Sequence, residues 1–217
     1  GGFQRLEIIY IADGHHRSAA ASRVAAKRKL ENPHHAGDES YNRFLIASFP
    51  KAEVLVMDYN RVIKDFNGLS EGDLVTHLRE NFEVEESDQP VKPDAHRKFG
   101  MYMHGCWYKL TYNGPAPDAS SPNATLDVNI LDKSVLIPLL GIDDPRTDTR
   151  IGFVGGIRGL AELEKMVDGG EWALAFSLFP ISVDQLLAVA DAEEIMPPKT
   201  TWFEPKLADG MVSLVLD

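Results

Sequence analysis

The sequence predicts an α+β fold built on a mixed sheet with flanking helices. Segments with strand character alternate with segments of helical spacing along the 217 residues, and the middle of the chain has the spacing of hairpins rather than of crossover helices. This length suits one large domain or two small ones. The stretch 115–123 is rich in Pro, Ser and Asp, and it marks a weak candidate boundary between two parts.

The first predicted elements are a buried strand and a basic helix. Residues 6–12 form a nearly continuous apolar run with β-branched side chains, which is typical of a buried strand. Residues 15–30 are rich in Ala, Lys and Arg and place apolar side chains at helical spacing, which predicts a helix with a basic outer face. Pro33 and Gly37 end this helix.

Two further apolar runs predict a pair of strands. They cover residues 43–49 and 52–59, and Pro50-Lys51 separates them. Residues 63–66 extend the second strand.

The next stretch predicts a helix, a loop and a hairpin. Ser70 is a suitable N-cap for a helix that runs to residue 81. Residues 83–97 are charged and contain two prolines, so we expect a solvated loop. Residues 99–112 form apolar runs on both sides of Gly105, which predicts a hairpin.

The second half of the chain alternates between the two kinds of element. Helical spacing extends over residues 126–140 and stops at Gly141. The later predictions are a strand at 150–154, a helix after Gly159, a strand at 172–178, a helix at 183–190 and a final strand at 211–216.

Charge and cysteine content limit the classes of function. Lys and Arg number 22 against 33 Asp and Glu, so the net charge is -11, which disfavours non-specific DNA binding. No apolar run approaches the roughly 18 residues of a membrane-spanning helix. The single Cys106 forms no internal disulfide, which fits a reducing cytoplasm, and its apolar surroundings favour a buried thiol over a nucleophile.

The strongest chemical motif lies between the first predicted strand and helix. It consists of Asp13, Gly14, His15, His16 and Arg17. Free backbone N–H groups and the positive end of a helix dipole meet at such a turn, which suits phosphate. Arg17 can clamp phosphate oxygens, the histidines can move protons, and Asp13 can accept a proton or hold a metal ion. The alternative is an Asp N-cap followed by solvent-facing histidines.

A second motif lies near the end of the chain, at residues 196–206. Its prolines favour an extended shape, which suits either a binding strap or a surface connector. In a binding strap, the cations would neutralise phosphate charge, the hydroxyls would donate hydrogen bonds and Trp202 would stack on a base. Glu204 would be a possible ligand of Mg²⁺. The candidate phosphate- or nucleotide-binding residues here are Lys199, Thr200, Thr201, Trp202 and Lys206.

Three weaker features each have a structural explanation as an alternative to a role in binding. Arg61 follows an apolar run and either points into a pocket or flanks the edge of the sheet, with the edge slightly favoured. Gly155-Gly156 is a turn rather than a dinucleotide fingerprint. His34-His35, near two acidic residues, lacks a second ligand pair, so a solvated loop is favoured over a metal site.

Several of these motifs together resemble the DUF1015 family of uncharacterised bacterial and archaeal proteins. The resemblance rests on residues 11–17 with the alanine-rich helix, Asn60-Arg61-Val62, Leu126-Asp127-Val128 and the motif at 196–206, and it covers essentially the whole chain. Full-length members of that family are longer on the N-terminal side. The resemblance therefore implies that residues 1–217 are the C-terminal part of a longer protein, whose N-terminal part packs against this chain.

The first motif is also similar to the phosphate-binding turn of the ParB/sulfiredoxin-like superfamily. Gly14 and Arg17 match that turn, which implies a strand–turn–helix phosphate site at the start of the chain. Sulfiredoxin activity is disfavoured, because histidine stands where a cysteine is required. The acidic charge disfavours DNA partitioning of the ParB type. The free serine kinases of this superfamily, with an Asp-Gly-His-x-Arg-like turn, are the nearest chemical analogue.

The resemblance implies a nucleotide-dependent phosphotransferase that acts on a small hydroxyl substrate, with free L-serine as the best guess. Asp13, His15 and His16 would be catalytic, and Mg²⁺ with ATP or another phosphate donor would be required. A nucleotide- or phosphometabolite-binding module without catalysis is the first alternative. A ParB-like protein associated with nucleic acid is the second, and it rests on the basic residues Arg23, Lys27, Arg28 and Lys29.

Overall fold

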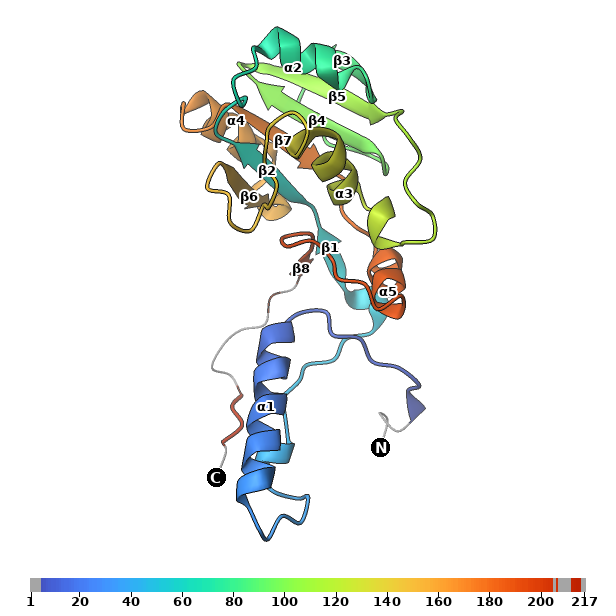
Figure 1. Cartoon of the computed structure of the whole chain (residues 1–217), viewed down its shortest axis with the longest axis vertical. Coiled ribbons are helices and arrows are strands. Elements are labelled where there is room, and N and C mark those ends of the chain that lie inside the picture. The colour runs from blue at the N-terminus through green and yellow to red at the C-terminus, as the bar shows by residue number, and fades with distance from the viewer. Residues whose placement is uncertain (1–4, 205, 207–211, 216–217) are drawn as a thin grey trace. The chain divides into compact units, whose positions relative to one another are not determined.

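The computed structural model describes residues 5–204, 206 and 212–215, and its chain forms two compact units (Figure 1). The α1 unit consists of residues 1–55 and 203–217, and the sheet unit consists of residues 56–202. The α+β class that the sequence predicts is confirmed, since the chain combines helices with a sheet of antiparallel strand pairs.

The helices and strands have the following bounds. The helices are α1 (His15–Glu31), α2 (Glu71–Leu78), α3 (Asp127–Leu131), α4 (Leu160–Asp168) and α5 (Val183–Asp191). The strands are β1 (Leu55–Met57), β2 (Tyr59–Ile63), β3 (Phe82–Ser87), β4 (Lys98–Met103), β5 (Cys106–Tyr112), β6 (Ile151–Gly155), β7 (Leu174–Leu178) and β8 (Trp202–Glu204).

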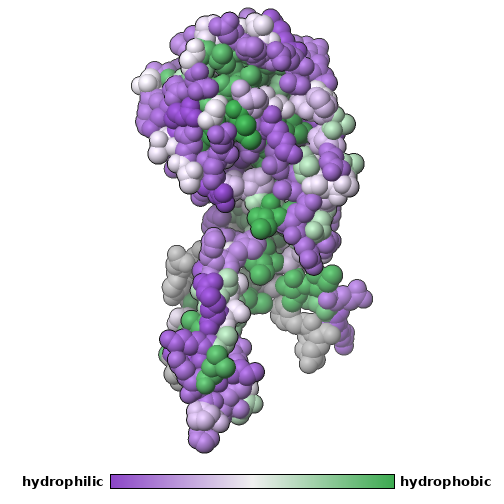
Figure 2. All heavy atoms as spheres, in the orientation of Figure 1, coloured by the Kyte–Doolittle hydropathy of each residue, from purple (hydrophilic) through white to green (hydrophobic). Residues whose placement is uncertain are grey.

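The α1 unit contains the predicted basic helix but not the predicted buried strand. Residues 6–12 form no strand, and Leu6, Ile8, Ile9 and Ile11 are between 51% and 62% exposed. Residues 43–49 likewise form no strand and expose Phe44 and Ile46. Figure 2 shows apolar surface in this unit. Both predictions were wrong because a strand needs a hydrogen-bonding neighbour, and no described segment pairs with either run.

The sheet unit is built on six strands in the order β3-β5-β4-β7-β2-β6. All the neighbouring pairs run antiparallel, so this sheet is antiparallel throughout, whereas the sequence led us to expect a mixed sheet. The predicted pairing of 43–49 with 52–59 is replaced by pairing of β2 with β6 and β7. Helix α4 covers one face, where Leu163 and Val167 join a core with Val62, Tyr102 and Ala175.

Local sequence signals for turns and caps are confirmed. Ser70 accepts a hydrogen bond from the backbone N–H of Asp73 and forms a capping box with that residue at the start of α2. The hairpin β4–β5 turns at His104 and Gly105, which both have positive φ, 49° and 79°. This pair of left-handed residues is the requirement of a tight hairpin turn.

The predicted pattern of strands and loops needs correction at three places. The expected loop at 83–97 begins inside strand β3, whose exposed acidic side chains alternate with more buried ones. Strand β8, which forms a two-stranded sheet with β1, was not predicted. The expected final strand lies partly outside the described residues, since Met211 and Leu216 are not described, and residues 212–215 form no strand.

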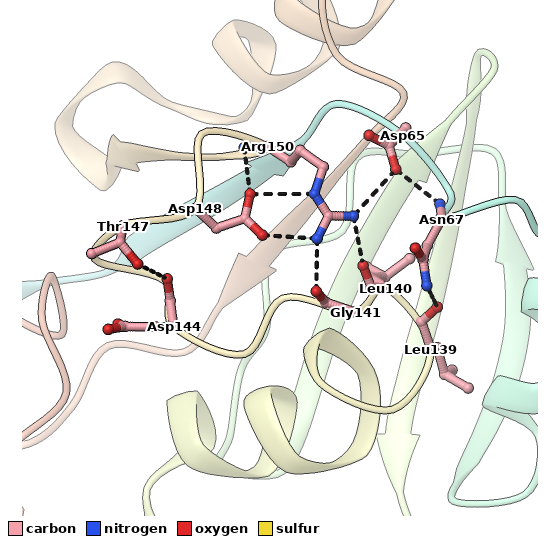
Figure 3. A network of polar contacts seen from close by, with 9 residues as sticks. All are labelled: Asp65, Asn67, Leu139, Leu140, Gly141, Asp144, Thr147, Asp148 and Arg150. Atoms are coloured by element: carbon pink, nitrogen blue, oxygen red, sulfur yellow. Dashed lines mark hydrogen bonds and ion pairs between the residues drawn. The ribbon is translucent and has the colours of Figure 1, made fainter.

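The segment after α3 continues as a π-helical turn over Asp132–Leu136 and ends near Gly141, as the sequence predicts. Arg150 binds this end to the start of β6 (Figure 3). Its guanidinium donates to the carbonyls of Leu140 at 3.0 Å and Gly141 at 2.7 Å, and it pairs with Asp148 at 2.8 Å. The carbonyl groups at the end of the helical segment are therefore paired with the side chain of Arg150, the residue that precedes β6.

Asn60 occupies a buried position in β2 and joins it to β7. Its Oδ1 accepts a hydrogen bond from the backbone N–H of Leu178 at 3.0 Å, and its Nδ2 donates to Asp58 at 2.7 Å. The side chain is 1% exposed, so these bonds replace the water that both groups would otherwise contact.

We expect the substitution Asn60→Ala to lower the free energy of unfolding by about 2 to 4 kcal/mol, because it leaves a buried N–H and a buried carboxylate without their partner. Urea denaturation monitored by circular dichroism measures this difference. The matched control is Asn113→Ala at an exposed position, where a change below about 0.5 kcal/mol is expected. Equal stability of the two variants would contradict the role assigned to Asn60.

Candidate functional site

The segment that the sequence predicts to bind phosphate forms a turn at the N-terminus of α1, without the predicted strand before it. Gly14 has φ of 85°, a left-handed conformation that glycine adopts without strain, and its N–H donates to Asp13 Oδ1 at 2.7 Å. No side chain caps α1, and its first turn carries no acidic residue. The backbone N–H groups that open this helix are therefore available to an external anion.

Arg17 adds a positive charge to the same turn. A Cβ placed on Gly14 would lie 3.1 Å from Arg17 Nη2 and 3.2 Å from Nε, so the guanidinium folds back against the glycine. Asp13, His15, His16 and Arg17 are all exposed. The turn thus combines a helix N-terminus, a guanidinium and a carboxylate that are open to solvent, the residue types that phosphate recognition uses.

Arg61 lies inside the sheet rather than at its edge. Strand β2 runs between β6 and β7, so the sheet-edge interpretation was wrong. The guanidinium donates to the carbonyl of Tyr59, lies 5.5 Å from the centre of the Phe153 ring and belongs to a residue that is 2% exposed. Its charge is stabilised by an aromatic face and a carbonyl within the unit.

Asp132 is the acidic residue whose charge acts on Arg61. Burial lowers the pKa of the Arg61 guanidinium to about 10, and the charge of Asp132 opposes this effect. Burial raises the pKa of the Asp132 carboxyl to about 6, against the opposing charge of Arg61. Asp132 opens the π-helical turn, and such turns are frequent near functional sites. Nothing in the sequence around Asp132 singled this residue out as a candidate functional residue.

The motif at 196–206 folds partly onto the sheet unit, around Tyr59. Trp202 packs edge-on against the Tyr59 ring, with 5.6 Å between centroids, and Lys199 Nζ lies 5.8 Å from the same ring. A Cβ on Gly155 would come within 2.6 Å of Trp202, so this glycine makes room for the indole. Thr200 is 6% exposed and donates to the carbonyl of Pro197 at 2.6 Å.

The remaining residues of this motif lie on both sides of the division between the two units. Thr201 is half-buried, and Lys206 and Glu204 belong to the α1 unit, where the backbone N–H of Lys206 donates to Glu204 Oε2 at 3.1 Å. Lys199, Thr200 and Trp202 are thus gathered around one tyrosine of the sheet unit.

A pocket in the sheet unit contains a histidine that the sequence did not single out. His96 and Asp127 lie on its wall with Tyr59 and Thr200. His96 falls in the stretch expected to be a solvated loop, and 31 residues separate it from Asp127. Spacing therefore gave no signal, although Leu126-Asp127-Val128 belongs to the family resemblance.

The weaker candidates have structural explanations. His35 contacts Glu39 at 3.0 Å and Tyr41 at 2.9 Å, and the residues that the structure describes include no group of three potential metal ligands. Gly156 begins a short 3-10 turn, as expected for Gly155-Gly156. Cys106 is a free, half-buried thiol. Within the described part of the chain, no helix has the length and apolar character needed to cross a membrane.

Comparison with known proteins gives one family match and distant structural similarity. Residues 2–132 match the family described as Protein of unknown function (DUF1015), and no curated protein matches the sequence. A free serine kinase in complex with AMP is similar with a TM-score of 0.43 and 16% identity over 89% of this chain, which spans 66% of that kinase. A conserved hypothetical protein from Pyrococcus furiosus has a TM-score of 0.41 and 15% identity, with 89% and 68% of the two chains covered.

We expect Asp132→Asn to stabilise the protein at neutral pH. The folded state raises the pKa of this carboxyl from 3.8 to about 6, so its contribution to stability is complete below pH 3.8 and is lost as pH rises through 6. Because asparagine stays neutral, the variant should gain on the order of 2 kcal/mol over the parent at pH 7.5 and nothing near pH 4.

Urea denaturation at the two pH values measures this difference, and Asp88→Asn at an exposed position is the control. A gain from Asp132→Asn that is equal at both pH values would show that ionisation of Asp132 is not its cause.

Proposed function

We propose that this chain, which belongs to the DUF1015 family, takes part in nucleotide-dependent phosphoryl transfer to a small hydroxyl-bearing substrate, with free L-serine as the leading candidate. The observation that carries the proposal is the turn at the start of α1, where Arg17 lies against Gly14 and the first N–H groups have no capping side chain. A phosphoryl group is the ligand that this combination of charges and donors fits best.

In the proposed reaction each residue of the turn has one task. The backbone N–H groups of the first turn and the Arg17 guanidinium hold the phosphate that is transferred. The acceptor hydroxyl oxygen forms a bond to the γ-phosphorus, the bond from that phosphorus to the β-phosphate oxygen breaks, and Asp13 accepts the hydroxyl proton. His15 and His16, which are exposed at the same turn, donate hydrogen bonds to the phosphate oxygens or assist in proton transfer.

A magnesium ion fits the oxygen donors of this turn. Asp13 Oδ1 accepts the Gly14 N–H, which leaves the second carboxylate oxygen for a cation. Protein Mg²⁺ sites commonly use one or two carboxylates together with substrate phosphates. Asp13 would hold the ion in place of accepting the proton, or Glu204 would hold the ion and leave Asp13 as the base. In either arrangement the ion would neutralise charge on the phosphates.

The second motif provides further candidate residues for nucleotide binding, of which those up to Trp202 belong to the sheet unit. Lys199, Thr200 and Trp202 are gathered around Tyr59, which supports a binding strap rather than a free connector. In the proposal Trp202 offers its indole to a base, and cations offset phosphate charge. The other proposed contacts are Thr201 and Lys206, whereas Arg61 is 2% exposed inside the sheet and is not a contact to the nucleotide. The N-terminal part of a longer protein is the proposed packing partner.

We expect the full-length protein to transfer phosphate from ATP to L-serine in the presence of Mg²⁺, measured by ³¹P NMR of the product. Asp13→Asn and Arg17→Ala should each lower the rate by about 100-fold or more, because they remove the proton acceptor and the phosphate clamp. Arg43→Ala, at an exposed arginine of the same unit, is the control and should leave the rate unchanged.

Unchanged rates in both Asp13→Asn and Arg17→Ala would overturn the assignment of the turn. Calorimetric binding of ATP without any phosphorylated product over hours would instead favour a nucleotide-binding module without catalysis.

We also expect Gly14→Ala to weaken ATP binding about 10-fold, because the added methyl group displaces the Arg17 guanidinium and strains the turn. Gly37→Ala is the matched control, since Gly37 also has a positive φ of 97° but nothing lies within 4 Å of its added Cβ. Calorimetry on both variants separates backbone strain from loss of the site. Equal losses of affinity would contradict a role for the Gly14 turn.

A further inference from the structure

Two Asn-Gly dipeptides occur in the sequence, at Asn67-Gly68 and at Asn113-Gly114. In such a dipeptide the glycine nitrogen can attack the side-chain carbonyl carbon of the asparagine, because glycine has no Cβ to hinder ring closure. Asn67 and Asn113 are both exposed, so water reaches both side chains. The reaction in the folded protein therefore depends on whether the nitrogen is free and whether the backbone has room to move.

Asn67 and Gly68 are the central residues of a tight turn between β2 and α2. Both have positive φ, 54° and 80°, and the N–H of Leu69 donates to the carbonyl of Phe66 at 3.1 Å to close the turn. The N–H between the two central residues takes no part in this closing bond. Among the residues that the structure describes, no group accepts a hydrogen bond from the Gly68 N–H. The attacking nitrogen is therefore free.

The surroundings of Gly68 leave room for the ring to close. Nothing lies within 4 Å of a Cβ placed on this glycine. The Asn67 side chain donates a hydrogen bond from Nδ2 to the carbonyl of Leu139 at 3.3 Å (Figure 3). This distance is longer than that of most N–H···O bonds, so the amide can leave the carbonyl and turn toward the glycine nitrogen.

The second dipeptide has the same chemistry in a different setting. The N–H groups of Asn113 and Gly114 both donate to the carbonyl of Asn81, at 2.9 and 3.1 Å. A Cβ placed on Gly114 would lie 2.6 Å from Asn81 Oδ1 and 2.9 Å from the Tyr112 ring. Here the nitrogen is bound and the backbone is packed in, so the folded protein protects this site from ring closure.

We propose that Asn67 is a site of spontaneous modification, at which the side-chain amide becomes a carboxylate. The Gly68 nitrogen forms a bond to Cγ of Asn67, the bond from Cγ to Nδ2 breaks, and ammonia leaves with the proton that the glycine nitrogen loses. Water then opens the cyclic imide at either carbonyl carbon, which yields an aspartyl or an isoaspartyl residue. Water is the co-reactant, and the modification is independent of the proposed phosphoryl transfer.

The modification changes how this turn is attached to the helical segment that ends near Gly141. In Figure 3 the Asn67 amide meets the Leu139 carbonyl, and Asp65 accepts the backbone N–H of Asn67 at 2.9 Å. A carboxylate in place of the amide cannot donate to that carbonyl, and it adds a negative charge near Asp65. An isoaspartyl residue also lengthens the backbone within the turn. The modified protein is therefore less stable than the parent.

Peptide mapping by mass spectrometry, on protein stored for weeks at mildly alkaline pH, tests the proposal. We expect conversion at Asn67 to be about 10-fold faster than at Asn113 in the folded protein, since this ratio corresponds to about 1.4 kcal/mol, the size of one backbone hydrogen bond. In urea, where both turns are unfolded, the two rates should become similar. Cleavage by an endoprotease specific for aspartate separates the two products, because an isoaspartyl bond resists it.

Asn67→Asp reproduces one of the two products and isolates its effect on the fold. We expect its Tm, followed by circular dichroism, to fall by about 2 to 4 °C relative to the parent. Asn113→Asp is the matched control, since the exposed Asn113 is also followed by a glycine. Its Tm should stay within about 1 °C of the parent.

No conversion at Asn67, or equal rates at Asn67 and Asn113 in the folded protein, would overturn the proposal. An unchanged Tm in Asn67→Asp would overturn the effect assigned to the modification. The storage experiment contains no nucleotide, so its outcome is distinct from the outcome of the phosphoryl-transfer assay.

Discussion

The hydrogen bonds of Asn60 are the constraint on which the sheet unit depends. Strands β2, β6 and β7 come from distant parts of the sequence, and β2 lies between the other two. Where the ladder of β2 and β7 runs out, the Asn60 side chain takes the backbone N–H of Leu178 and reaches Asp58. Because buried polar groups must be paired, this amide fixes the end of β7 against the start of β2.

Several residues with side chains suited to ligand binding lie at the same end of the sheet. Tyr59 begins β2 and supports Trp202 and Lys199, and its ring also lines the pocket that contains His96. Two carboxylates of the sheet unit act in different ways. Asp127 is used to orient an imidazole, whereas Asp132 lacks comparable hydrogen bonds and its pKa rises to about 6. The environment, rather than the residue type, separates their roles.

Local signals in the sequence were enough to predict the helices, the hairpin and the turn that begins α1. Ser70 and the His104-Gly105 turn act within a few residues, so the pattern contains the cause. The runs 6–12 and 43–49 were misread because apolar, β-branched residues predict a strand only where a partner strand exists. Strand β3 was missed because its acidic face resembles a loop, although its other face is more buried.

The two candidate sites also differ in whether a local pattern in the sequence contains them. The residues of the Asp13–Arg17 turn are contiguous, so spacing and helix chemistry are enough to propose it as a phosphate site. The pair His96 and Asp127 is formed by tertiary structure, since a loop before β4 and the first residue of α3 meet only in the folded unit. No pattern of residues along the chain carries such a contact.

A crystal structure of the protein soaked with ATP and Mg²⁺ would test directly whether the turn at the start of α1 binds phosphate. We expect phosphate oxygens within hydrogen-bond distance of the N–H groups that open α1 and of the Arg17 guanidinium, with Lys206 facing the same ligand. A nucleotide bound elsewhere, with Arg17 and Lys206 facing solvent, would contradict it.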